Sequence, residues 1–180
     1  MEVRLGLGEG GKHLWTRDVG RQWRTRLEAL LDGLAVGGTV VIDAKDVEVF
    51  DYSFANEFFG KILLSLPGTY PGRFLIVEHL SDYARENLEK ALESLALAII
   101  ERRERTLQLL GKVHPSDQIT FTAIVQARQA VTAAVLRDQL GINLTAVNER
   151  LAKLTSLGLV RREKSVSAAG REQYVYSAPS

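Results

Sequence analysis

The chain has 180 residues, of which 46% are hydrophobic and 25% are charged, and it contains no cysteine. This length and composition allow one or two globular cores. The lack of cysteine excludes disulfides, thiolate metal sites and a cysteine nucleophile. No run approaches the roughly 18 apolar residues of a membrane span, and the first residues lack a signal-peptide core. We therefore expect a soluble, cytoplasmic protein with no membrane partner.

Positive and negative charges are unevenly distributed along the chain. Residues 1–111 hold 14 Lys and Arg against 17 Asp and Glu, whereas residues 112–180 hold nine against five. The two parts carry net charges of −3 and +4, consistent with the formal +1 of the whole chain. The charged and then apolar segment 102–111 is expected to lead out of a first domain. We predict domains at residues 1–111 and 112–180.

In the first part, strand patterns alternate with helix patterns. Gly8–Gly11 could form a phosphate loop, but no Lys-Ser/Thr follows, so a turn between a strand and a helix explains these glycines better. Asp51, or else Ser53, is expected to cap the second helix. Loops are expected at Pro67-Gly68 and Pro71-Gly72. The alternation predicts an α/β layer of three to five strands, with strands or extended pieces at 3–7, 39–44, 46–50, 73–78 and 96–101, and helices at 16–34, 54–64 and 81–94.

Part of this region resembles the STAS domain, and more narrowly a STAS-like domain family of unknown function. The resemblance lies in residues 40–43, Val47 and the run 51–61, and residues 71–75 and 85–88 are similar to later parts of such chains. Some of those chains end in a winged helix. The resemblance implies a domain that senses a signal or mediates interaction with another protein.

The turn at residues 51–54 departs from one branch of that family. STAS proteins that antagonise anti-sigma factors carry an Asp-Ser-Ser-Gly turn, and the serine after the Asp accepts a phosphate. Tyr52 replaces that serine here, and Phe54 replaces the glycine. Ser53 is either a phosphate acceptor at a helix N-terminus or only a cap. Asp51, Tyr52 and Ser53 are therefore a candidate switch.

Little in the sequence points to catalysis. The histidines lie in three separate segments without metal-ligand spacing, at His13, His79 and His114. Three carboxylates near strand ends could form an acidic cluster for magnesium in a hydrolase, namely Asp43, Asp46 and Asp51. Neither a nucleophile elbow nor a dinucleotide fingerprint is present. We predict that the chain is not an enzyme and has no metal or cofactor.

The second part has the pattern of three helices followed by a hairpin. Ser116 is expected to cap a helix at 119–128, Thr132 a helix that ends at Gly141, and Asn143 a third helix that ends at Gly158. Two strands, 159–166 and 171–176, flank a turn at 167–170. The third helix has an apolar inner stripe made of Leu144, Val147, Leu151 and Leu154.

This order of elements resembles the winged helix-turn-helix DNA-binding family. The resemblance is carried by Thr132, Leu136, Leu140-Gly141, Arg150-Leu151, Leu154, Gly158-Leu159-Val160, Arg162, Gly170-Arg171, Tyr174 and Tyr176. It implies double-stranded DNA as partner, with the third helix in the major groove and the hairpin on the phosphate backbone. The expected base contacts are Thr145, Asn148, Glu149 and Lys153. The expected phosphate contacts are Arg150, Arg161, Arg162, Lys164 and Arg171, although Arg150 could instead be a structural ion-pair partner.

The sequence thus predicts an α+β/α/β chain, with a small STAS-like α/β domain followed by a winged helix-turn-helix domain. The leading hypothesis is a homodimeric, DNA-binding transcriptional regulator whose STAS-like domain senses a signal or mediates dimerisation. The alternative is a signalling adaptor: the STAS-like domain would bind a kinase-like ATPase or a sigma-regulator protein, and the winged helix would dock on protein.

Overall fold

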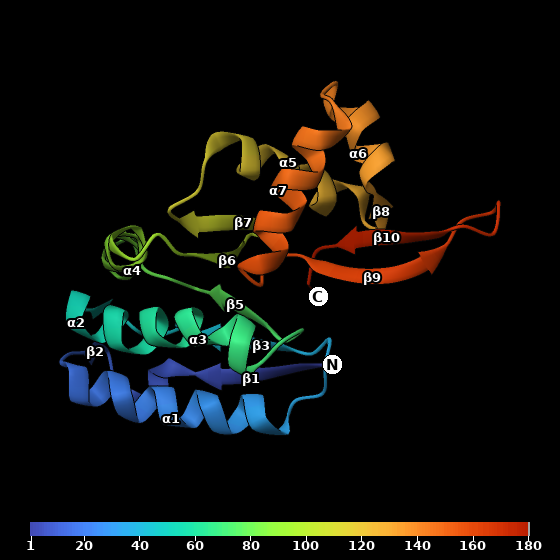
Figure 1. The fold of residues 1–180 in the computed structure, drawn as a ribbon. Coiled ribbons are helices and arrows are strands. Elements are labelled where there is room, and N and C mark those ends of the chain that lie inside the picture. Colours follow the sequence, from blue (N-terminus) through green and yellow to red (C-terminus); the bar gives the residue numbers. More distant parts are fainter. Residues whose placement is uncertain (180) are drawn as a thin grey trace. The chain divides into compact units, whose positions relative to one another are not determined.

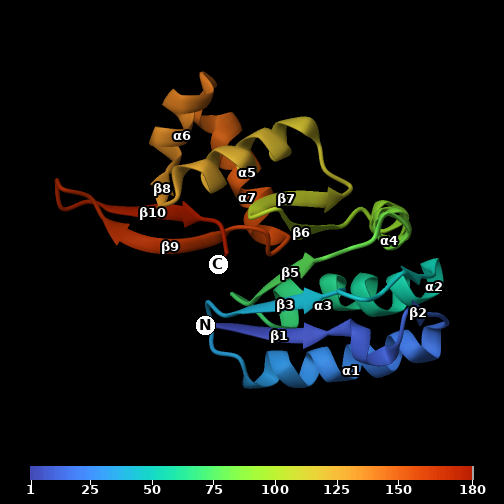
Figure 2. The same cartoon turned by 180° about the vertical axis from the view of Figure 1, so that it is seen from behind.

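A computed structural model describes residues 1–179 and divides the chain into two compact units, Met1–Val113 and His114–Ser180. Figures 1 and 2 show the elements of each unit from opposite sides. In the part of the chain that the model describes, no helix combines the length and the apolar character needed to cross a membrane.

The first unit is built on a five-stranded sheet in the order β1-β3-β5-β6-β7. Four strands are parallel, namely β1 (Glu2–Gly6), β3 (Thr39–Asp43), β5 (Phe74–Glu78) and β6 (Ala98–Arg103). The last strand, β7 (Thr106–Gly111), is antiparallel to β6. A short parallel pair joins β2 (His13–Leu14) to β4 (Val49–Phe50). The predicted α/β class, with three to five strands, is therefore confirmed for this unit, and its central sheet is mostly parallel.

Helices cover one face of this sheet and share a core with it. They are α1 (Arg17–Gly33), α2 (Tyr52–Ala55), α3 (Lys61–Thr69) and α4 (Asp82–Ser94), with a π-helical turn at Asn56–Gly60 between α2 and α3. A short 3-10 turn, Leu7–Gly10, follows β1. Alternate strand residues such as Val40, Ile42 and Val77 pack in one cluster with Trp23 and Leu27 of α1. Because side chains alternate along a strand, the residues between them point to the opposite face.

Three expectations for this unit were wrong. The segment 102–111 does not leave the domain, because it completes β6 and forms β7. The turn between these strands places Glu104 and Arg105 at φ values of 47° and 70°, without the glycine or asparagine that usually signals such a hairpin. Pro67 lies inside α3 and not in a loop; because proline has no N–H, the Leu63 carbonyl four residues earlier receives no helical hydrogen bond from it. Only Val49–Phe50 of the extended piece 46–50 is a strand.

The second unit contains α5 (Pro115–Ala127), α6 (Ala133–Leu140) and α7 (Leu144–Ser156). Its antiparallel sheet has the order β8-β10-β9, with β8 at Val131–Thr132, β9 at Arg161–Val166 and β10 at Glu172–Ser177. Its buried hydrophobic residues include Phe121, Ile124, Leu136, Val147, Leu151 and Leu154.

Local capping chemistry sets the helix ends of this unit. The Thr132 hydroxyl accepts the N–H of Val135 at 3.3 Å, and the Asn143 side chain accepts that of Ala146 at 2.8 Å. Gly141 ends α6 in the left-handed conformation, as expected. The expected cap of α5 was wrong: His114 caps that helix and Pro115 begins it, where proline is favoured because the first N–H has no intrahelical partner.

Candidate nucleic-acid interface

One flank of α7 borders a shallow groove of about 250 Å³. Leu144 and Asn148 line it from α7, and they are four residues apart, so they lie one above the other on the same side of the helix. The other lining residues come from the start of α6 and from β10, and they are Thr132, Ala133, Ala134, Gln173, Tyr174 and Tyr176. Within the described part of the chain, no charged side chain lines this groove.

The position of Leu144 corrects the predicted inner stripe of α7. Val147, Leu151 and Leu154 are buried as expected, but Leu144 is 42% exposed. It is the first residue of α7, next to the Asn143 cap, and its side chain borders the groove. We refer to Leu144 and Asn148 together as the groove flank of α7.

The hairpin of β9 and β10 presents one of its faces to the same groove. Tyr174 is opposite Lys164 and Tyr176 is opposite Arg162, so these four side chains share a face. The Arg162 guanidinium lies over the Tyr174 ring, 4.7 Å from its centroid, in a cation–π contact. Tyr176 is buried beside them, and its burial raises the pKa of its hydroxyl. Arg162 and Lys164 are exposed.

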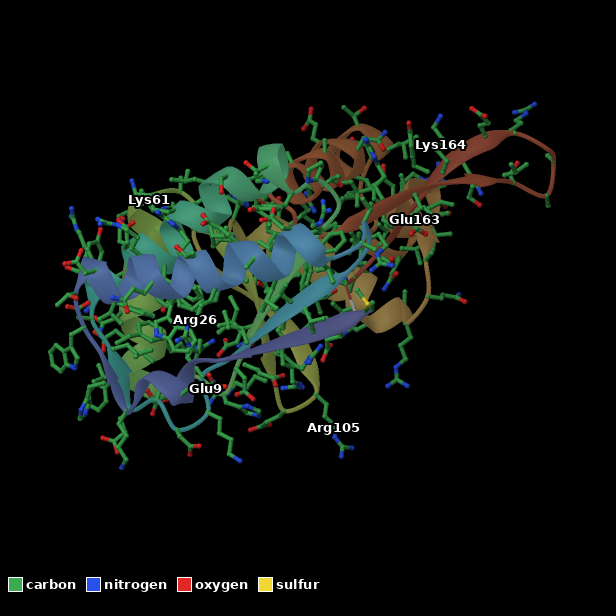
Figure 3. All side chains as sticks on the ribbon, turned by 90° about the horizontal axis from the view of Figure 1, so that it is seen from below. Glu9, Arg26, Lys61, Arg105, Glu163 and Lys164 are labelled. Atoms are coloured by element: carbon green, nitrogen blue, oxygen red, sulfur yellow. The ribbon has the colours of Figure 1, made fainter. Side chains whose placement is uncertain are left out.

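The other expected phosphate contacts on the hairpin are placed differently. Glu163 and Lys164, labelled in Figure 3, are successive residues of β9 and therefore point to opposite faces. Arg161 shares the face of Glu163, with 3.9 Å between its Nη1 and the Glu163 Oε1. Arg171 is exposed next to the turn, where its backbone N–H donates to the Ser167 hydroxyl.

The opposite flank of α7, made of Glu149, Arg150 and Lys153, borders a second hollow of about 330 Å³ at the start of α5. The Lys153 Nζ lies 2.6 Å from the Oδ2 of Asp117, a residue that is only 5% exposed. The Arg150 Nη1 donates to the Thr120 hydroxyl at 3.4 Å. Lys153 and Arg150 thus have partners on α5, and we call this side the α5 flank. Thr145, another expected base contact, is exposed on the first turn of α7.

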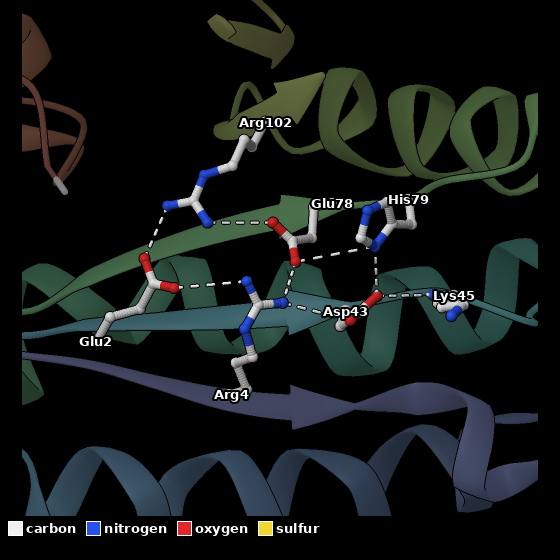
Figure 4. Close-up of polar contacts among 7 residues, drawn as sticks. All are labelled: Glu2, Arg4, Asp43, Lys45, Glu78, His79 and Arg102. Carbon is white, nitrogen blue, oxygen red and sulfur yellow. Dashed lines mark hydrogen bonds and ion pairs between the residues drawn. The ribbon is translucent and has the colours of Figure 1, made fainter. Parts of the chain in front are cut away.

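A second group of charged residues lies on the sheet of the first unit, on the face away from the helices (Figure 4). Arg102 spans two strands, since it donates to Glu2 at 2.8 Å and to Glu78 at 3.1 Å. Arg4 also pairs with Glu78, which is 4% exposed, and it lies 3.4 Å from Asp43. The hydrogen bond from Arg102 lowers the pKa of Glu2. These contacts connect four neighbouring strands through alternating charges.

Asp43 and His79 lie at one end of this network and hydrogen-bond to each other. The His79 Nδ1 lies 2.7 Å from the Asp43 Oδ1, and the same oxygen accepts the Lys45 backbone N–H at 2.9 Å. Burial alone would raise the pKa of Asp43, but these two bonds together with the nearby positive charge of Arg4 outweigh it, and the pKa is lowered. Sequence patterns alone did not group His79 with Asp43. The signal that could have joined them is that Asp43 ends β3 and His79 directly follows β5, the adjacent parallel strand.

Three of these side chains could offer ligands to a cation. The ligand atoms of Asp43, Glu78 and His79 lie within 4.8 Å of one another. However, Arg4 and Arg102 already bond to Glu78, so a divalent ion would have to displace or face two guanidinium groups. We interpret the group as a structural network. The other members of the predicted acidic cluster have local roles: Asp46 occupies a turn at φ 67°, and Asp51 caps α2.

The candidate switch at residues 51–53 begins α2. Asp51 is the cap, because its Oδ1 accepts the Phe54 N–H at 2.7 Å. The Tyr52 hydroxyl shares a hydrogen bond of 2.9 Å with Ser94, although the side chain remains 43% exposed. Ser53 is half-buried in the first turn.

Comparison with known proteins yielded no match, either to a protein-family model or to a curated protein.

Proposed function

We propose that the chain is a DNA-binding transcriptional regulator, with a winged helix-turn-helix in His114–Ser180 and a STAS-like domain in Met1–Val113. The observation that carries this proposal is the uncharged groove between α7 and the hairpin, with Arg162 and Lys164 exposed on the hairpin face that borders it. Such a surface offers neutral groups to base edges and cations to the adjacent phosphates.

The dimensions of α7 suit this role. An α-helix with its side chains is about 10–12 Å wide, and the major groove of B-DNA is about 12 Å wide. The groove flank would face base edges, while Arg162, Lys164 and Arg171 would neutralise backbone phosphates. Arg150 and Lys153 contribute less, because their side chains already contact α5.

The distribution of charge supports the same division of labour. Residues 112–180 carry a net charge of +4, whereas residues 1–111 carry −3. An acidic domain is repelled by the phosphate backbone, so it is better suited to sense a signal or to form a homodimer than to touch DNA. We propose no catalytic role for the ion pairs of this domain, because each carboxylate in the network has a basic partner within the protein.

Selection of bound fragments from genomic DNA, at about physiological salt, tests the proposal. The full chain should enrich a defined set of fragments, and a variant with Arg162→Ala and Lys164→Ala should recover much less DNA. The result that would overturn the proposal is recovery no better than that of an unrelated protein of equal charge.

The adaptor remains the second candidate because Tyr52, at the candidate switch, is an exposed aromatic residue. A pull-down from cell extract, with and without nuclease, separates the two functions. A specific protein partner that survives nuclease treatment and is lost in Tyr52→Ala favours the adaptor, whereas recovery that depends on intact DNA favours the regulator.

A further inference from the structure

We propose that the groove flank selects neighbouring A·T base pairs, with Asn148 binding the adenine edge and Leu144 contacting a thymine methyl group. This inference rests on the proposed function and names the sequence class that the same site binds. It narrows a prediction in which base contacts were spread over Thr145, Asn148, Glu149 and Lys153, because Glu149 and Lys153 lie on the α5 flank.

The side chains that line the groove favour contact with A·T pairs over G·C pairs. Recognition of guanine commonly uses Arg or Lys on O6 and N7, and Asp or Glu can accept from cytosine N4. Among the described residues that line this groove, none has either kind of side chain. Asn148 offers the amide that pairs with adenine N6 and N7.

Leu144 provides the second half of the preference. It is a branched apolar side chain, 42% exposed, at a position that faces the groove instead of the core. In the major groove only thymine presents a methyl group. An apolar contact to that methyl removes a small hydrophobic area from water. The contact therefore favours thymine over cytosine, and over uracil, which lacks the methyl.

The spacing along α7 sets how far apart the two base pairs are. Positions i and i+4 are separated by about 6 Å along the helix axis. Base pairs follow one another every 3.4 Å or so. Leu144 and Asn148 therefore reach base pairs that are one or two steps apart, with Ala133 and Ala134 at the start of α6 leaving room for the DNA.

The test uses the full chain and the consensus duplex obtained from selected fragments. Replacing the contacted thymine by deoxyuridine, which lacks the methyl, should weaken binding about fourfold. Replacing the contacted adenine by 7-deazaadenine, which lacks N7, should weaken it about fivefold. In Leu144→Ala the deoxyuridine effect should vanish while the 7-deazaadenine effect remains, and Asn148→Ala should show the reverse.

Both side chains are exposed and Asn143 is the cap of α7, so these variants should keep the fold, which far-ultraviolet circular dichroism checks. Glu149→Gln is the matched control on the α5 flank and should keep the consensus. G·C pairs at the contacted positions, or a deoxyuridine effect that persists in Leu144→Ala, would overturn the inference while leaving DNA binding intact. Failure to enrich any fragment would instead overturn the proposed function and this inference with it.

Discussion

The hairpin cations give the sharpest test of the proposed interface. Arg162 and Arg171 are both exposed, and neither has a strong ion pair among the contacts described above. If each neutralises one phosphate, changing both to alanine should reduce the slope of log affinity against log salt by about 1.8, since each contact contributes about 0.9. Between 50 and 200 mM salt, a fourfold change, wild-type affinity should then fall about 12-fold more than that of the double variant.

A matched control separates phosphate contact from a general loss of charge. Lys61→Ala with Lys90→Ala removes the same two charges from exposed positions on helices of the acidic unit. Fluorescence anisotropy of a labelled duplex, titrated at several salt concentrations and at one pH, gives each slope. The reasoning is refuted if the Arg162/Arg171 slope stays at the wild-type value, or if the Lys61/Lys90 variant shows the same change.

Two further predictions concern stability. Asp117→Ala removes the buried carboxylate that accepts a charged hydrogen bond from the half-exposed Lys153, which should cost about 1–2 kcal/mol after solvent screening is allowed for. Hydrogen exchange of α7 amides should speed up accordingly. Exchange at the wild-type rate would contradict this. The lowered pKa values of Glu2 and Asp43 stabilise the fold above their unfolded values near 4, and this contribution is lost as the pH falls through their lower folded values. Urea unfolding should therefore show that the double variant Glu2→Gln/Asp43→Asn loses less free energy of unfolding than wild type as the pH falls below about 4. Equal losses would show that these two carboxylates do not contribute to acid unfolding.

Elements with strong local signals were predictable from the sequence. The caps at Thr132 and Asn143 and the apolar run of β3 depend on residues close together in the chain. β7 was missed because its turn uses Glu104 and Arg105 at positive φ, which no local turn signal indicated. That turn is maintained by the pairing of β6 with β7, which a local pattern does not report.

The candidate interface was predictable only as a helix face. Periodicity placed Asn148, Glu149 and Lys153 together, since all three are polar positions away from the buried stripe. It could not show that Lys153 meets Asp117, which is 36 residues away, or that Leu144 lies outside the core. Both facts depend on how α5 and β10 pack beside α7, and both changed the expected base contacts.

The small number of base contacts has a consequence for assembly. A bidentate contact from Asn148 discriminates by about 1–3 kcal/mol, and a methyl contact from Leu144 adds about 0.8 kcal/mol. One unit would therefore contribute about 2–4 kcal/mol of discrimination between sequences. In typical regulators specific binding exceeds non-specific binding by about 4–10 kcal/mol, so one unit reaches at most the lower end of that range. Two units on paired half-sites would supply about 4–8 kcal/mol, so we propose that specific binding by this surface requires a homodimer. A duplex with two half-sites should outcompete random DNA far better than a duplex with one, and equal selectivity for both would show that dimerisation does not supply the specificity.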